Sequence, residues 1–150
     1  MLFNKNFHHE RNLKGRPDEY FHVLSDVNKW YLWNPNILHA SIDGPFREGT
    51  TGMSMPKEYT YSPMTLGEII PAKKVTLIFH LPLGSVTVNY LLNEEQPDIT
   101  KVIRQTRVTG FPGWSLYVMK AKTFRRNFDA TLNALESQVL KERKHKAGRF

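Results

Sequence analysis

The sequence predicts an α+β fold with a seven-stranded antiparallel sheet, a long C-terminal helix, and two short helices between strands 1 and 2. Six apolar runs lie between about residues 36 and 110, separated by turn residues and by no helical stretch. Such runs pair as an antiparallel meander rather than as parallel βαβ units. A helical pattern follows them over about 115–144, and a further strand with two short helical patterns precedes them.

The first strand is expected over residues 2–13 and ends at a Gly- and Pro-containing break over 14–17. Pro17 suits the first position of a helix, and acidic residues follow it in the first turn. A short helix is therefore predicted over about 17–25.

A second short helix is predicted to begin at Ser25-Asp26, whose side chains are good helix caps, and to run to about Trp33. Asn34 precedes Pro35, and a residue before proline is pushed out of the helical region. Trp30 stands three residues after Val27 and is expected to be core. Trp33, at the helix end, is a candidate contact at a cavity mouth.

The six runs of the expected sheet differ in how clearly they alternate. The fourth and fifth have the clearest period of two, and the sixth alternates more loosely. The runs are 37–43, 50–55, 63–70, 75–81, the run with Val86, Val88 and Tyr90, and 99–109.

The C-terminal helix carries one apolar face, with residues that step by three or four along the chain. At 1.5 Å per residue a helix over 115–144 is more than about 40 Å long. Its apolar face comprises Tyr117, Ala121, Phe124, Phe128, Leu132, Leu135 and Val139.

Composition excludes several classes of protein. The 150 residues include no cysteine, which rules out disulfide scaffolds, thiolate metal sites and cysteine nucleophiles and suits a reducing cytosol. No secretory leader and no apolar run of about 18 residues is present, so a cytoplasmic protein without a transmembrane segment is expected. The net charge is +7, and the tail at 141–150 supplies five cations against Glu142.

The basic tail has two interpretations. Cations at a helix end favour the negative pole of the helix dipole, so a solvated helix end is the favoured interpretation. A docking site for an acidic partner is the alternative. Nucleic-acid binding is not expected, because the basic residues are not interleaved with exposed aromatics.

Four segments, in this order, resemble the SRPBCC superfamily, also called START-like or helix-grip, and above all its polyketide cyclase/dehydrase-type members. They are RPDEYFHVLSDVNKWYLWNP at 16–35, IDGPFREGTTGMSM at 42–55, GEIIPAKKVTLIF at 67–79 and FRRNFDATLNALES at 124–137. The resemblance covers nearly the whole chain, so 1–150 is expected to be a single ligand-binding domain. It implies that the sheet wraps around the long helix and leaves an apolar cavity. No cofactor is expected.

Apolar residues at one parity of the strands are the candidates to line that cavity, with a plain filled core as the alternative. The case is stronger for Trp114 and Tyr117, which follow a Pro-Gly break where the cavity of the family opens. The full set is Trp33, Met53, Met55, Leu77, Phe79, Val88, Tyr90, Phe111, Trp114 and Tyr117.

Polar residues on the strands offer only weak catalytic candidates. Glu68 shares its parity with Leu66, so a buried acid with a raised pKa is one interpretation. Arg104 and Arg107 differ in parity, so only one points inward. An outward Arg104 is favoured, whereas an inward one could bind a carboxylate or phosphate. Tyr59 and Tyr61 complete the set.

No metal site is expected, because His8 and His9 point to opposite faces of a strand and no HExxH, phosphate-loop or GxSxG motif occurs. The leading hypothesis is binding of a hydrophobic or amphipathic small molecule, such as a lipid, a polyketide-like aromatic or an isoprenoid. The alternatives are a cyclase/dehydratase-like enzyme on the same cavity and a partner-binding module of the chaperone-ATPase-activator type. The oligomeric state stays open.

Overall fold

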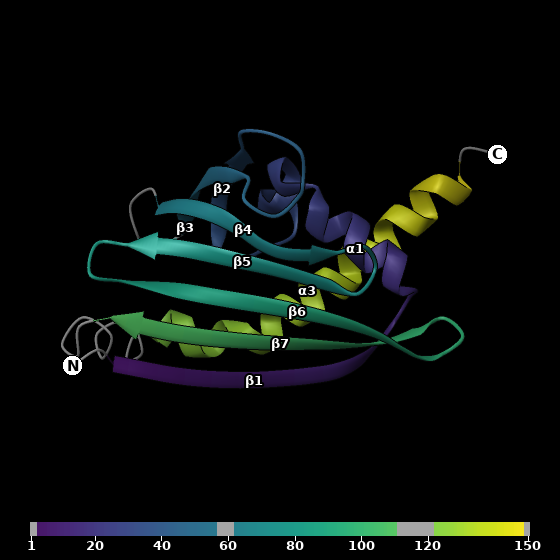
Figure 1. The fold of residues 1–150 in the computed structure, drawn as a ribbon. Coiled ribbons are helices and arrows are strands. Elements are labelled where there is room, and N and C mark those ends of the chain that lie inside the picture. The colour runs from purple at the N-terminus through teal and green to yellow at the C-terminus, as the bar shows by residue number, and fades with distance from the viewer. Residues whose placement is uncertain (1–2, 57–61, 111–121, 149–150) are drawn as a thin grey trace.

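The expected α+β architecture is confirmed by a computed structural model of the chain, which describes residues 3–56, 62–110 and 122–148 (Figure 1). Its helices are α1 (Pro17–Ser25), the 3-10 helix η1 (Val27–Leu32) and α3 (Lys122–Ala147). Its strands are β1 (Phe3–Lys14), β2 (Ile37–Ile42), β3 (Thr51–Pro56), β4 (Ser62–Ile70), β5 (Lys74–Leu81), β6 (Gly84–Gln96) and β7 (Ile99–Gly110).

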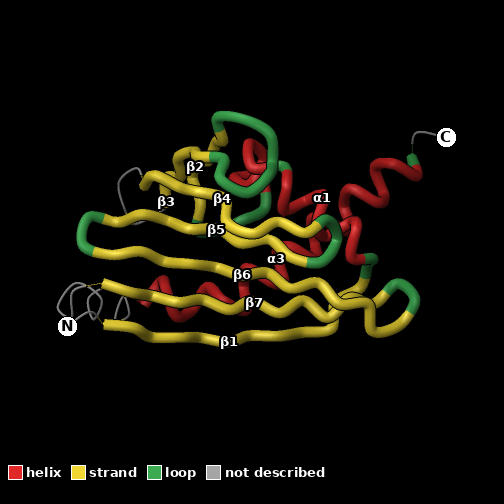
Figure 2. Tube along the Cα trace, viewed as in Figure 1, coloured by secondary structure: helices red, strands yellow, loops and turns green. Residues whose placement is uncertain are grey.

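The seven strands form one antiparallel sheet in the order β1-β7-β6-β5-β4-β3-β2 (Figure 2). From β2 to β7 each strand pairs with its neighbour in sequence, as a meander does. The N-terminal strand β1 then pairs with β7. Consequently the first and the last strand in the sequence lie side by side.

Helix α3 lies across one face of this sheet, which we call the inward face (Figure 1). Buried positions alternate along β7, where Val102 and Val108 have no exposed surface. On α3, Leu132 and Leu135 are equally buried. Arg11, whose register partner on β7 is Val102, donates a hydrogen bond from Nη1 to Oδ1 of Asn133. The inward face of β1 and β7 therefore packs against α3, as the predicted apolar face of the helix requires.

The short helices follow the prediction with one correction. Helix α1 begins at Pro17 and ends at Ser25 as expected. The next turn is a 3-10 helix, and the Asp26 side chain makes no capping hydrogen bond. Trp30 is 2% exposed and donates from Nε1 to the carbonyl of Leu24 at 3.0 Å. Trp30 is thus core, as expected.

Strand β4 departs from simple alternation. Its pairing with β5 shifts register between Leu66 and Ile69, which inserts a bulge. Met64 and Leu66 are buried before the bulge, whereas Ile69 packs against the core after it. The bulge turns Glu68 outward to solvent, so the expectation of a buried acid there is wrong.

A tight junction joins β1 to α1 at Gly15. Its N–H donates to the carbonyl of Asp98 at 2.8 Å, and its own carbonyl accepts from the Thr100 hydroxyl at 2.7 Å. Gly15 has φ of +130°, and a Cβ there would lie 2.9 Å from Tyr20 Cε2. Only glycine fits this backbone and this space without strain.

Helix α3 ends at Ala147, three residues beyond the expected end. Its expected start at about residue 115 lies outside the described residues. Within the part of the chain that the structure describes, no helix is long and apolar enough to cross a membrane.

Candidate ligand-binding site

The inward face has an apolar half over β4, β5 and β6. Leu77 pairs in register with both Leu66 and Val88, so the three side chains lie side by side on one face. All three are at most 4% exposed. Phe79, next along β5, is partly buried against the same core. Leu77, Phe79 and Val88 therefore share the face that the alternation predicted.

A row of polar residues crosses β6, β7 and β1 on the same inward face, between the buried apolar residues Val102 and Val108 of β7. Tyr90, Arg104 and His9 are consecutive register partners, so they form a row across three neighbouring strands. Arg104 donates from Nε to the Tyr90 hydroxyl at 3.2 Å, and its guanidinium carbon lies 5.8 Å from the centre of the Tyr90 ring. Tyr90 is 3% exposed, and the Nη1 atom of Arg104 is buried.

The favoured prediction of an outward Arg104 is therefore wrong. Arg104 shares its parity with the buried Val102 and Thr106. Arg107 takes the other parity, is exposed, and donates from Nε to Oδ1 of Asn6 at 3.3 Å. Arg104 thus places a cation on the inward face, and Arg107 places one on the outer face of the same strand.

Two buried hydroxyl groups add to the polar character of the inward face. Ser54 is fully buried and Thr106 is 2% exposed. Neither Ser54 Oγ nor Thr106 Oγ1 has a hydrogen-bond partner among the residues that the structure describes. A buried hydroxyl without a partner is costly, because it has lost its hydrogen bonds to water and gained none in the protein.

Met53 and Met55 do not line the inward face, which corrects the sequence prediction. Met53 pairs with Pro63 and Met55 with His39, and both partners are exposed. Ser54, between the two methionines, is the residue of β3 that points inward. The sequence prediction assigned the two methionines to the wrong face of β3. The strand is short and carries Met and Ser side chains at alternate positions, so no clear apolar period indicates which face is buried.

The remaining candidates are only partly placed. Trp33 follows η1 and is half-buried against the core; its role as a mouth residue stays a prediction. Phe111, Trp114 and Tyr117, together with Tyr59 and Tyr61, lie outside the described residues.

Glu68 lies away from the inward face. Its carboxylate accepts a hydrogen bond from Lys74 Nζ at 2.8 Å, and its side chain is 53% exposed. Among the described residues no group of three or more His, Cys, Asp or Glu side chains is arranged to hold a metal ion.

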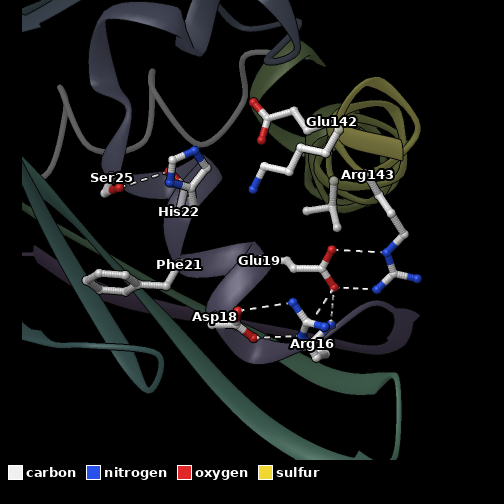
Figure 3. A pocket seen from close by; sticks show the side chains of 10 residues that line it. Arg16, Asp18, Glu19, Phe21, His22, Ser25, Glu142 and Arg143 are labelled. Atoms are coloured by element: carbon white, nitrogen blue, oxygen red, sulfur yellow. Dashed lines mark hydrogen bonds and ion pairs between the residues drawn. The ribbon is translucent and has the colours of Figure 1, made fainter. Parts of the chain in front are cut away.

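A second feature is a polar groove of about 400 Å³ between α1 and the C-terminal part of α3 (Figure 3). Arg143 lies at one side of it and donates from Nε to Glu19 Oε2 at 3.0 Å. Its Nη1 donates to Asp98 Oδ2 at 3.0 Å, and Nη2 donates to both carboxylates. The groove is lined by Arg16, Asp18, Glu19, Phe21, His22, Ser25, Val139, Glu142, Arg143 and Lys146.

We call Arg143 with Glu19 and Asp98 the Arg143 clasp. Hydrogen bonds from Arg143 hold the pKa of the Glu19 carboxyl below its usual value, and the Arg16 backbone N–H adds to this effect. The same guanidinium lowers the pKa of Asp98. The carboxylates in turn raise the pKa of Arg143. Arg143 is therefore not part of a purely solvated tail, as the favoured interpretation of 141–150 assumed.

Two features of the structure were not predicted from the sequence: the inward position of His9 and the Arg143 clasp. His9 was considered only as a metal ligand, although the apolar residues Phe7 and Leu13 share its parity and indicate that it points inward. In the Arg143 clasp, Glu19 lies 124 positions and Asp98 lies 45 positions from Arg143 along the chain. No local pattern reports such a contact.

Comparison with known proteins gives matches in structure. No protein-family model and no curated protein sequence matches the chain. The Zhui aromatase/cyclase from Streptomyces sp. R1128 matches with a TM-score of 0.76 at 13% identity, over 93% of this chain and 95% of that one. Norcoclaurine synthase from Thalictrum flavum matches with a TM-score of 0.73 at 16% identity, over 93% and 88% of the two chains.

The di-domain aromatase/cyclase StfQ from the steffimycin biosynthetic pathway also matches, with a TM-score of 0.75 at 11% identity, over 94% of this chain and 52% of that one. Identities at this level carry information on the fold. The chain therefore has the helix-grip fold that its sequence motifs predict.

Proposed function

We propose that this protein binds an apolar or amphipathic small molecule between the inward face of its sheet and α3. The observation that carries the proposal is the buried row of Tyr90 and Arg104 beside an apolar surface. Pockets for small molecules typically combine an apolar lining with a few convergent polar groups. The inward face has this composition.

The hydroxyl groups beside that row support a binding role. The Tyr90 hydroxyl accepts from Arg104 Nε at 3.2 Å, so its own proton is left for an acceptor on a ligand. Thr106, two residues from Arg104 on the same face of β7, adds a buried hydroxyl whose Oγ1 has no hydrogen-bond partner in the described part of the chain. A ligand with a polar group beside an apolar skeleton would satisfy these two hydroxyls.

The structural neighbours are consistent with this proposal. A structure of norcoclaurine synthase contains dopamine and hydroxybenzaldehyde, and that protein shares the fold at 16% identity. The fold therefore accommodates small aromatic molecules in at least one protein, and a lipid, a polyketide-like aromatic or an isoprenoid would fit the apolar half of the inward face.

The proposal is tested by filling the inward face. Val88→Phe adds bulk at an inward position of β6, and Thr87→Phe adds the same bulk at the neighbouring outward position. Binding of the neutral fluorescent probe N-phenyl-1-naphthylamine is expected for the wild type and Thr87→Phe and is expected to be lost in Val88→Phe. Circular dichroism would establish that both variants fold. Absence of probe binding to the wild type, or equal binding by the two variants, would contradict the proposal.

Native mass spectrometry of the purified protein is the complementary experiment. A bound ligand would appear as additional mass that is lost when the protein is denatured. Identification of the released molecule would then give the ligand directly.

A cyclase-like enzyme on the same face is the second candidate, and one observation favours it. The Tyr90 hydroxyl is held by Arg104 on a water-poor face, and a positioned phenol can serve as a general acid. Two neighbours in structure are aromatase/cyclases. Tyr90→Phe would retain ligand binding and abolish turnover of a polyketide-like substrate under this proposal; unchanged turnover would reject Tyr90 as the acid.

A further inference from the structure

We infer that the ligand carries an uncharged oxygen function, such as the carbonyl of an aromatic ketone or quinone. This oxygen lies at Thr106 and Tyr90, and the apolar skeleton extends from there toward β4. The inference rests on the proposed binding function and adds the chemical class of the ligand, its orientation and two residues that determine specificity. It follows from the register of the sheet and from which side chains of the inward face already have partners.

Thr106 places a hydroxyl in an otherwise apolar row that crosses the inward face. Across β6, β5 and β4 the register continues from Thr106 through Val88 and Leu77 to Leu66. On the other side its register partner on β1 is Phe7, which is partly buried against the core. Three strand spacings separate β7 from β4, a distance of about 14 Å. A ligand of two to three fused rings that lies along this row therefore meets a polar group at its β7 end.

Two hydroxyl groups at that end are left to donate. Thr106 is 2% exposed, and its Oγ1 has no hydrogen-bond partner among the residues that the structure describes. Tyr90 lies diagonally opposite Thr106, because its register partner on β7 is Arg104, two residues away, and long side chains reach each other over such a diagonal. The Tyr90 hydroxyl accepts from Arg104 Nε, which leaves its proton for an acceptor. A carbonyl oxygen, which has two lone pairs and no proton, accepts from both hydroxyls.

The charged groups on this side of the sheet favour a neutral oxygen over an anion. Arg11 donates to Oδ1 of Asn133 on α3, and His9 and Arg104 also interact with other groups of the protein. Helix α3 adds a negative charge, the Glu136 carboxylate, which accepts from the backbone N–H of the last residue of β1 at 2.9 Å. The cations here are therefore engaged within the protein, and a carboxylate lies on the same side. A carbonyl needs a hydroxyl donor and no opposite charge, so it suits these surroundings.

Three naphthalenes that differ in one substituent test the inference. 2-Acetylnaphthalene carries a carbonyl, 2-ethylnaphthalene lacks it, and 2-naphthoate is an anion; displacement of N-phenyl-1-naphthylamine measures the affinity of each. Thr106→Val replaces the hydroxyl by a methyl group and is expected to weaken binding of the ketone about fivefold, the net effect of one hydrogen bond, and of the hydrocarbon by less than about twofold. The wild type is expected to bind the ketone more tightly than the naphthoate.

Infrared spectroscopy of the bound ketone tests the contact with Tyr90. A hydrogen bond weakens the C=O bond, so the carbonyl band of the bound ketone is expected at a lower frequency in the wild type than in an apolar solvent. Tyr90→Phe keeps the ring and removes the donor, so the ketone is expected to bind still and its band to move to a higher frequency.

Thr87→Val is the matched control, because it makes the same chemical change at the outward position next to Val88 and is expected to retain both the ketone affinity and the band. Thr106→Ala serves if Thr106→Val does not fold. Equal ketone affinity in the wild type and Thr106→Val, a carbonyl band that Tyr90→Phe leaves unchanged, or tighter binding of the naphthoate than of the ketone would each overturn the inference and leave the proposed function standing. A wild type that binds neither the three naphthalenes nor N-phenyl-1-naphthylamine contradicts the proposed function itself.

Discussion

Arg143 on α3 and Glu19 on α1 form a two-pronged ion pair, in which Nε and Nη2 of the guanidinium each donate to one carboxylate oxygen. Glu19 is only 15% exposed, and its carboxylate also accepts from the backbone N–H of Arg16 at 3.0 Å. The same arginine reaches Asp98 in the turn between β6 and β7. One side chain thus ties the C-terminal helix to the first helix and to the sheet.

Removing this side chain is expected to destabilise the fold. Arg143→Met should lower the free energy of unfolding by about 1–2 kcal/mol, a modest value because solvent screens these partly exposed groups. Lys141→Met, at an exposed position of the same helix, is the control and should change it by less than about 0.5 kcal/mol. Urea denaturation followed by circular dichroism measures both; equal losses would show that the clasp contributes nothing specific.

The clasp also predicts how stability depends on pH. The pKa values of Glu19 and Asp98 are lowered in the folded state, so their stabilisation is present above the ordinary carboxyl pKa of about 4. As the pH falls through the lowered values, the unfolded state binds more protons and this stabilisation is lost. The unfolding free energy of the wild type should therefore fall more steeply than that of Arg143→Met between about pH 5 and pH 2.5. Parallel curves for the two proteins would contradict the prediction.

The two tryptophans of the first helical region are expected to differ in role. Trp30 is almost fully buried and hydrogen-bonded to Leu24, so Trp30→Ala should cost about 3–5 kcal/mol of stability. Trp33 is half-buried, so Trp33→Ala should cost less and should weaken binding of N-phenyl-1-naphthylamine more than Trp30→Ala does. Denaturation curves and probe titrations on both variants decide this; a larger stability loss at Trp33 would reverse the assignment.

Gly15→Ala is expected to destabilise the protein by about 2–4 kcal/mol. The new methyl group would require an unfavourable backbone conformation and would meet Tyr20 Cε2 at 2.9 Å and Val139 Cγ1 at 3.1 Å. Gly49 provides the control, since it has φ of +91° and no atom lies within 4 Å of the position that a methyl group would take there. Gly49→Ala should cost only the backbone strain, about 1 kcal/mol. Thermal unfolding would separate the two effects, and equal losses of stability would contradict the role assigned to the contact with Tyr20.

Much of the fold was predictable, because hydrophobic periodicity and turn residues act locally. Pro17 fixed the start of α1, and the period of two in β5 and β6 placed Leu77, Val88 and Tyr90 on one face. The orientation of Arg104 was not predictable in the same way. Strand β7 has apolar residues at both parities, with Val102 inward and Ile103 outward, so alternation gave no unique answer.

Two further errors have physical causes that a single sequence does not report. The bulge in β4 reverses parity between Leu66 and Ile69, which is why Glu68 points outward. The Arg143 clasp depends on how three distant elements pack, and the basic composition of 141–150 conceals it. Local patterns in the sequence therefore predicted the strands and the helices. The orientation of the polar side chains in the site depends on how the whole sheet assembles.

The Arg143 clasp is one of several attachments along α3. Asn133 accepts a hydrogen bond from Arg11, and the Glu136 carboxylate accepts one from the backbone N–H of Lys14 at 2.9 Å. Leu132 and Leu135, on the same stretch of the helix, have no exposed surface. Because these contacts also hold the helix against β1 and the core, substitutions at Glu19 or Asp98 are expected to change the stability of the protein more than the position of α3 over the sheet.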